Sequence, residues 1–255
     1  MEIKNCRLCN NNKLSFLFSL GNLSFTGKFS HNNQINIPKS KISLVICKKC
    51  KLVQLSQNFN PKYLYGKDYG YRTGINLTMK NHVKKIVIEA QKLSKINKGD
   101  YVLDIASNDG TMLNYYKRDL VTVGIDPILS NFKKFYKNIN FKVNDFFSFN
   151  TLKNNKLDNK YKIISALSVF YDLKKPNNFL KDIKKLLHPS GVFILEHADL
   201  LSIVKNNLFD TICHEHLEYY STKIIIDIMY KNNLKVLNIK KNNINGGSIR
   251  YYISH

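Results

Sequence analysis

YVLDIASNDG, at residues 101–110, is the stretch from which the fold of this chain can be read. Its first half is an apolar run with the length of a buried strand, and its second half is a turn of small and polar residues that ends at Gly110. A nicotinamide-binding turn at such a place usually carries three glycines, which let the backbone approach a pyrophosphate. This turn has one glycine beside Ala106, Ser107 and Asn108, so it suits a cofactor without a pyrophosphate.

Strand and helix patterns alternate from this stretch to the end of the sequence. Further strand patterns fall at residues 120–127, 139–147, 161–170, 192–198, 234–241 and 248–254. Helical patterns begin at residues 111, 131 and 176. The last two strands form a hairpin whose turn can use the positive φ that Gly246 and Gly247 tolerate. The alternation predicts an α/β fold, a doubly wound seven-stranded sheet whose last strand runs antiparallel.

Acidic residues recur at the ends of the first three predicted strands, where open α/β sheets bind ligands. Asp126 lies 22 residues after Asp104, the spacing at which a carboxylate can accept both hydroxyls of a ribose. Asp145 can accept from an exocyclic amine, and Phe146 can cover an adenine face. Ribose and adenine without a pyrophosphate describe S-adenosylmethionine, the donor of class I methyltransferases. The expected donor site comprises Asp104, Ala106, Ser107, Asn108, Gly110, Asp126, Pro127, Asp145, Phe146 and Ser168.

Four of the five cysteines form two pairs near the N-terminus, Cys6-x-x-Cys9 and Cys47-x-x-Cys50. Each pair can place two thiolates on one tight turn, and two such turns complete a tetrahedral zinc site of four sulfurs. An iron–sulfur centre or redox-active pairs would use the same residues, but neither has a neighbouring signature here. Because four thiolates leave no open position, we expect structural zinc and no chemistry at the metal.

These patterns divide the chain into three parts. We expect a zinc-binding module over 1–58 and a methyltransferase domain over 99–255. Residues 59–98 form an aromatic and helical linker that covers the active site. Its helix pattern over 76–96 puts five apolar side chains on one face, from Met79, Val83, Ile86, Val87 and Ala90.

The composition is that of a soluble globular protein with a net charge of +22, which favours an anionic partner. Only four of its 40 basic residues are arginine, whose fork dominates base readout, so nucleic acid is the weaker candidate. A lysine bias of the genome would produce the same charge. No apolar run has the roughly 20 residues of a membrane span, and the N-terminus lacks a secretion signal, so we expect a cytoplasmic protein. No pattern specifies an oligomeric state.

Several segments together resemble the sugar C-methyltransferase family, which acts on 4-keto deoxysugar nucleotides. They are CRLC…CKKC, DYGYRTG, LDIASNDGTML, GIDP, SVFYDL, FDTICHEHLEYY and NGGSIR. The resemblance implies a zinc-binding N-terminal domain followed by a methyltransferase domain that uses S-adenosylmethionine. It also implies a mechanism in which a base removes the proton beside the keto group and the enolate attacks the methyl group. A sugar nucleotide of surface-polysaccharide or deoxysugar synthesis is the implied acceptor.

The segment CHEH at 213–216 admits a metal site, a catalytic site or a structural His–Glu pair. Two histidines at i and i+2 share a face only on an extended chain, and the i, i+4 spacing of zinc proteases is missing, so a metal is the weaker interpretation. The resemblance places the family's catalytic pair on Glu215 and His216, with His216 as general base at a near-neutral pKa. It also implies catalytic roles for Tyr69 and Tyr71, which are otherwise expected as core aromatics.

The resemblance assigns the acceptor side to Glu196, His214, Asp172 and Tyr171. Asp172 stands where many of these enzymes have histidine, and Cys213 where they often have tyrosine. The family's C-terminal domain is also expected to be lacking, because the sequence ends after the last predicted strand. These departures keep O-methylation of another phosphorylated acceptor open. An RNA methyltransferase and a non-catalytic partner that binds the cofactor are further alternatives.

Overall fold

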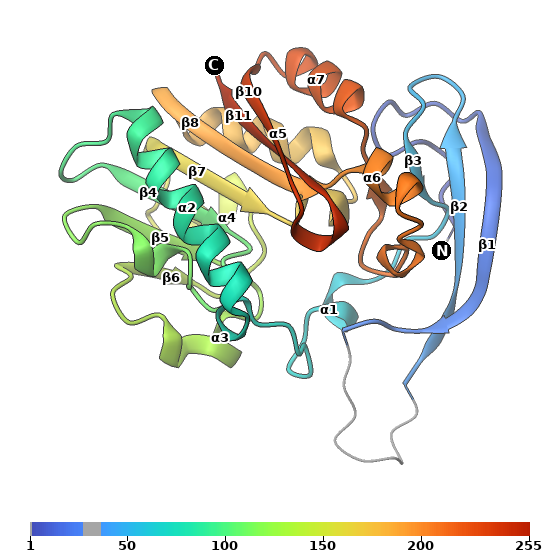
Figure 1. Cartoon of the computed structure of the whole chain (residues 1–255), viewed down its shortest axis with the longest axis horizontal. Coiled ribbons are helices and arrows are strands. Elements are labelled where there is room, and N and C mark those ends of the chain that lie inside the picture. The colour runs from blue at the N-terminus through green and yellow to red at the C-terminus, as the bar shows by residue number, and fades with distance from the viewer. Residues whose placement is uncertain (1, 28–36) are drawn as a thin grey trace.

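The computed structural model describes residues 2–27 and 37–255 and contains two sheets (Figure 1). The larger sheet has seven strands in the order β10-β11-β8-β7-β4-β5-β6. Its strands are β4 (Tyr101–Ile105), β5 (Val121–Ile125), β6 (Phe141–Val143), β7 (Tyr161–Leu167), β8 (Leu187–Ala198), β10 (Lys235–Asn242) and β11 (Ser248–Ser254). The pairings from β6 to β8 are parallel, and β11 runs antiparallel to both β8 and β10. The predicted doubly wound sheet with an antiparallel last strand is confirmed.

Both faces of this sheet are covered, as a parallel sheet with near-continuous apolar strands requires. The long helix α2 packs on one face together with the segment around η2. The other face carries α4, α5 and α7. The bounds are α2 (Leu77–Ser94), η2 (Leu113–Tyr115), α4 (Phe149–Asn154), α5 (Pro176–Leu186) and α7 (Thr222–Lys231). The inner strands are therefore buried on both sides, whereas the edge strand β10 is mostly exposed. The strand ends are where polar side chains can gather.

The predicted helix after Gly110 is reduced to the single 3-10 turn η2. After Gly110, ten residues (111–120) must return the chain to the start of β5 at Val121. A ten-residue helix would rise only about 15 Å, roughly the length of one five-residue strand, and would leave nothing for the turns. The helix expected from residue 131 is likewise replaced by two short turns, α3 (Leu129–Phe132) and η3 (Lys133–Phe135).

The smaller sheet has the order β1-β2-β3-β9 and is antiparallel throughout. Its first three strands come from the N-terminal region: β1 (Leu14–Ser24), β2 (Lys39–Cys47) and β3 (Val53–Leu55). The fourth, β9 (Glu218–Tyr219), comes from beyond β8 in the C-terminal half. The CHEH segment therefore leads directly into the N-terminal sheet.

The connecting segments complete the element list. Between β3 and α2 lie α1 (Pro61–Leu64) and η1 (Thr73–Ile75), and β7 is followed by η4 (Phe170–Asp172). The remaining short helices are α6 (Leu200–Lys205), η5 (Phe209–Thr211) and η6 (Ile244–Gly246). Within residues 2–27 and 37–255, none of the helices combines the length and the apolar character that crossing a bilayer requires.

Candidate functional site

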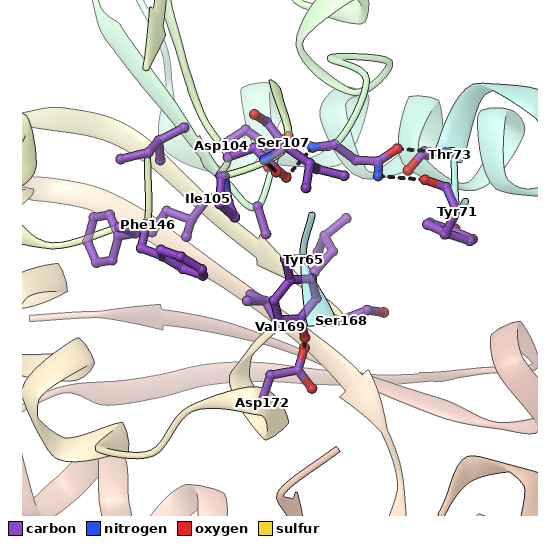
Figure 2. Close-up of a pocket in the computed structure, with 18 of the residues that line it drawn as sticks. Tyr65, Tyr71, Thr73, Asp104, Ile105, Ser107, Phe146, Ser168, Val169 and Asp172 are labelled. Atoms are coloured by element: carbon purple, nitrogen blue, oxygen red, sulfur yellow. Dashed lines mark hydrogen bonds between the residues drawn. The ribbon is translucent and has the colours of Figure 1, made fainter. Parts of the chain in front are cut away.

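A cavity of about 340 Å³ opens at the carboxyl ends of β4, β5 and β7 (Figure 2). Its walls come from these strand ends, from the loop that follows β6, and from residues 61–83, which cross over the top. Eight of the ten residues predicted for the donor site line it: Asp104, Ala106, Ser107, Asn108, Asp126, Pro127, Phe146 and Ser168. The topological position is the one at which open α/β sheets bind ligands.

Asp126 is held rigidly at the tip of β5. Its Oδ2 accepts a hydrogen bond of 2.8 Å from the Asn108 amide, and its Oδ1 accepts one of 2.8 Å from the Ile128 amide. Burial raises the pKa of Asp126 to about 6, although these two amides favour the ionised form. Carboxylate oxygens keep further lone pairs, so this side chain can still accept the two hydroxyls of a ribose.

The turn after β4 brings the backbone close to the cavity. Ala106 and Asn108 adopt left-handed φ angles of 55° and 51°, which side chains of this small or polar kind tolerate. Asp104 accepts a hydrogen bond of 2.6 Å from the Ser165 hydroxyl, and burial raises its pKa to about 7. With Phe146 presenting a partly exposed ring at the cavity edge, the residues present fit an adenosine without a pyrophosphate.

Two residues expected at the donor site do not line the cavity. Gly110 lies behind the turn, where a Cβ would meet Ile139 and Tyr136, so it serves close packing. Asp145 is exposed, and its Oδ1 accepts a hydrogen bond of 2.7 Å from the Phe146 amide. Of the two residues singled out after β6, only Phe146 lines the cavity.

The tyrosine-rich segment before α2 forms one wall of the cavity, to which Tyr65, Tyr69 and Tyr71 contribute. Asn108 ties this segment to the β4 turn, because its Nδ2 donates to the Tyr71 carbonyl (3.0 Å) and its Oδ1 accepts from the Thr73 amide (2.9 Å). Sequence reasoning missed Tyr65, although it belongs to the same run of tyrosines. Its hydroxyl donates to Asp172 Oδ2 at 2.8 Å, as Figure 2 shows.

His216 has a defined orientation beside the cavity. Its Nδ1 lies 2.7 Å from the Thr211 carbonyl oxygen, which can only accept a hydrogen bond, so Nδ1 carries a proton. Nε2 is the ring nitrogen left for a different partner. The ring packs on Tyr171, with centroids 4.3 Å apart, and contacts the Cys213 thiol. Glu215 is adjacent, and its Oε1 is buried without a hydrogen-bond partner among residues 2–27 and 37–255.

The charges around His216 change its titration. Burial lowers the pKa of His216, but Cys213 and Asp172 outweigh this effect and raise it to about 10. Burial raises the pKa of Glu215, which His216 partly counteracts. The near-neutral histidine pKa expected from the sequence is therefore wrong, because Cys213 and Asp172 lie next to the ring.

Asp172 connects the two halves of the site. It lines the cavity and interacts electrostatically with both His216 and Glu215, and burial raises the pKa of Asp172 well above the usual range of an aspartate. Its Oδ2 accepts from Tyr65, and its Oδ1 is buried without a hydrogen-bond partner in the described part of the chain. His216 and Glu215 therefore lie close enough to the cavity-lining Asp172 to interact with it electrostatically.

Two of the four residues expected on the acceptor side lie elsewhere. Glu196 is buried in an ion pair with Arg250 (Nε to Oε2, 2.8 Å) and contacts His82. His214 sits between Phe25 and Phe59, 4.6 and 4.9 Å from their ring centroids. Both side chains are bound to protein groups, and neither lines the cavity, whereas Asp172 does and Tyr171 packs on His216.

The four N-terminal cysteines meet at one point. Cys6 Sγ lies 3.6 Å from Cys50 Sγ, Cys9 Sγ lies 3.5 Å from Cys47 Sγ, and all four sulfurs are within 4.8 Å of one another. Sulfurs bound to zinc at about 2.3 Å in a tetrahedron lie roughly 3.8 Å apart, so the arrangement fits structural zinc. Cys213, Glu215 and His216 also place potential ligand atoms within 4.8 Å of one another, a second group that the spacing argument did not favour.

Comparisons with known proteins agree with this geometry. A family described as "Methyltransferase domain" matches residues 78–239, more than half of the chain. The chain belongs to this methyltransferase family. A second family, described as "Putative zinc binding domain", matches residues 6–65, which contain all four clustered cysteines. The methyltransferase is therefore S-adenosylmethionine-dependent, as the cavity indicates, and carries an N-terminal zinc-binding domain.

Individual relatives are more distant. The methyltransferase is 24% identical to C-methyltransferase NovU from Streptomyces niveus, over 97% of this chain and 60% of that protein's length. An S-adenosylmethionine-dependent methyltransferase from Clostridium acetobutylicum ATCC 824 has a similar structure, with a TM-score of 0.53 at 12% identity, covering 69% of this chain and 91% of the other. Magnesium protoporphyrin IX methyltransferase from Synechocystis PCC 6803 matches with a TM-score of 0.52 at 14% identity, covering 72% and 90%. These structures establish the fold.

Proposed function

We propose that this methyltransferase transfers a methyl group to a sugar nucleotide or a related phosphorylated sugar precursor, with His216 as general base and Glu215 assisting it. The observation that carries the proposal is the position of Asp172, which lines the donor cavity and interacts electrostatically with His216 and Glu215. S-adenosylmethionine supplies an electrophilic methyl group when it is bound. A base beside that methyl group is what deprotonation of an acceptor at carbon or oxygen requires.

The methyl donor, S-adenosylmethionine, would be held by the residues at the carboxyl ends of β4 and β5. Asp126 would accept the ribose hydroxyls, and Phe146 would cover the adenine. Tyr69 and Tyr71, which line the cavity, would hydrogen-bond an acceptor oxygen or cover the sulfonium. The nearby Cys213 and Asp172 keep His216 strongly basic, so the proton it takes would be held firmly.

Two observations support a phosphorylated acceptor. The net charge of +22 attracts anions, and Lys174 lies on the cavity wall. The relative NovU is named a C-methyltransferase, which supports methylation at carbon. Carbon methylation would follow if the base removed the proton beside a keto group and the resulting enolate attacked the methyl group. O-methylation of another phosphorylated acceptor needs the same base and is the second candidate, because Asp172 and Cys213 replace the family's acceptor-side residues. An RNA acceptor could be attracted by the same positive charge, but this protein has only four arginines for base readout.

We place the reaction in the cytoplasm, since thiolates that bind zinc need a reducing compartment. The decisive experiment incubates the purified protein with labelled S-adenosylmethionine and a panel of nucleotide sugars, sugar phosphates and tRNA. Mass spectrometry with fragmentation then locates the added methyl. Labelling of a nucleotide sugar at carbon or oxygen supports the proposal and decides between its two forms, whereas labelling of tRNA alone would refute it.

A further inference from the structure

The CHEH segment is built onto the zinc module and not onto the seven-stranded sheet. Immediately after His216, the Leu217 carbonyl accepts a hydrogen bond of 2.9 Å from the Leu55 amide. Strand β9 then pairs antiparallel with β3, Val53 opposite Tyr219 and Gln54 opposite Glu218. Figure 1 shows the N-terminal strands beside the segment around α6 that leads to this pairing. The backbone that directly follows Glu215 and His216 is thus paired with the N-terminal sheet.

Two further contacts hold the segment from its N-terminal side. His214 Nε2 lies 3.2 Å from the Ser40 carbonyl of β2, and the ring is enclosed by Phe25 and Phe59. Gly27 packs so closely on Glu215 that an added Cβ would collide with its Oε1. His214, Glu215, Leu217, Glu218 and Tyr219 therefore each have a neighbour in the N-terminal region, while the His216 side chain contacts Thr211 and Tyr171.

Arg7 joins the cysteine cluster to this arrangement. It lies between Cys6 and Cys9 on the first zinc-binding turn. Its Nη1 donates to the carbonyls of Leu55 (2.7 Å), the last residue of β3, and of Leu217 (3.4 Å), the residue directly before β9. Its Nη2 donates to the Gln57 carbonyl (2.6 Å) and to Asn58 Oδ1 (2.9 Å). One planar guanidinium therefore bridges both strands at the point where Leu217 follows His216.

The same turn is anchored to the methyltransferase domain on its other side. Asn177 of α5 donates to the Leu8 carbonyl at 2.8 Å. A turn fixed by metal ligands on both flanks and docked on α5 presents Arg7 in one orientation. Arginine suits this role better than lysine, because its rigid fork satisfies several acceptors at once.

We propose that Arg7 is a positioning residue for the acceptor half of the site. Zinc fixes the turn from Cys6 to Cys9, the turn fixes Arg7, and Arg7 fixes β3 and β9 and hence the place of Glu215 and His216. The role of those two side chains rests on the proposed function, but the structural coupling does not. The hydrogen bonds around Asp104, Asn108 and Asp126 are made without Arg7, so donor binding is independent of it.

The test compares Arg7→Met, of similar length but apolar, with the control Arg118→Met. Arg118 is exposed and precedes β5, at the end of the sheet opposite the cavity. In Arg7→Met we expect amide exchange at Leu55 to accelerate at least tenfold and turnover of the acceptor to fall at least tenfold. The zinc content, the exchange of the Asp126 amide and the dissociation constant for S-adenosylmethionine should stay within twofold of the parent. Arg7→Lys should fall between Arg7→Met and the parent in exchange and turnover, and Arg118→Met should match the parent in everything.

Two results would overturn the proposal. Unchanged exchange at Leu55 would show that Arg7 does not hold the strand pair. Equal acceleration at Leu55 and at Asp126, with weaker donor binding, would show general destabilisation instead of positioning. Should no acceptor be found for the parent protein, the proposed function fails, while the exchange and donor-binding measurements still decide whether Arg7 secures the β3–β9 pair.

Discussion

At the scale of single residues, the most informative side chain is His216. Its Nδ1 proton is held by the Thr211 carbonyl, and the Cys213 and Asp172 groups raise its pKa to about 10. A base with this pKa is protonated at neutral pH, so only a small fraction of the enzyme would be ready to accept a proton. The pH dependence of turnover therefore reports directly on the identity of the base.

If His216 is the base, kcat/KM should rise about tenfold per pH unit from pH 7 and level off only near pH 10. Cys213→Ser removes the sulfur group that raises the pKa of His216, so the plateau should move to lower pH. The measurement is a pH–rate profile for both proteins, with donor affinity checked at each pH. A parent profile that is flat between pH 7 and 9 would exclude His216 and favour Glu215.

Asp126 offers a second test at the residue scale. Ribose hydroxyls favour the ionised carboxylate, so the pKa of Asp126, about 6 in the free protein, falls on donor binding. Donor affinity should therefore be full above that pH and weaken as the pH falls through 6. Asp126→Asn should weaken binding of S-adenosylmethionine about 10- to 100-fold at pH 8, the value of a charged hydrogen bond.

Calorimetry can measure both effects, and Asp145→Asn is the matched control. Asp145 is an exposed carboxylate that does not line the cavity, so its loss should leave the affinity within twofold. An equal loss in both variants would contradict the placement described here and restore the role that the sequence suggested for Asp145.

At the scale of elements, the tyrosine-rich segment between β3 and α2 is the part that joins donor and acceptor sides. Tyr65 packs on Tyr69, with ring centroids 5.5 Å apart, and donates to Asp172. Asp172 in turn acts on His216. The segment therefore couples the cavity wall to the proton-handling groups through one hydroxyl.

Tyr65→Phe should reduce acceptor turnover about tenfold, because the Asp172 carboxyl group loses the only hydrogen bond that this side chain makes within the described residues. Donor affinity should change less than twofold, since the ring remains. Steady-state kinetics and donor titration check this, with Tyr63→Phe, a 61% exposed tyrosine of the same segment, as control. Loss of donor binding in Tyr65→Phe would place the hydroxyl at the donor instead.

At the scale of the whole molecule, the two sheets are not independent, because β9 belongs to the N-terminal sheet although it follows β8 in the chain. The end of the zinc-binding module at residue 58, expected from the sequence, remains a proposal. The structure adds that residues 218–219 complete its sheet. Loss of the zinc is therefore expected to disturb the segment that carries Glu215 and His216.

Native mass spectrometry should find one zinc per chain, and Cys47→Ser should lose it while Cys213→Ser retains it. Removal of zinc should melt the N-terminal sheet and abolish turnover, yet leave donor affinity within a few-fold, because the donor cradle belongs to the larger sheet. Two zinc ions per chain, with one lost in Cys213→Ser, would show that Cys213, Glu215 and His216 bind a metal.

The sequence alone determined the α/β alternation, the seven strands, the four zinc-ligand cysteines and eight residues of the donor cavity. These features are local: apolar runs set the strands, and residues at strand ends reach the same sheet edge whatever surrounds them. Only the tertiary structure decided that Glu196 is engaged by Arg250, that His214 is enclosed by Phe25 and Phe59, and that Tyr65 reaches Asp172. It also decided the pKa of His216 and the pairing of β9 with β3. These depend on contacts between residues far apart in the chain, and no local pattern encodes which partner a buried polar side chain will meet.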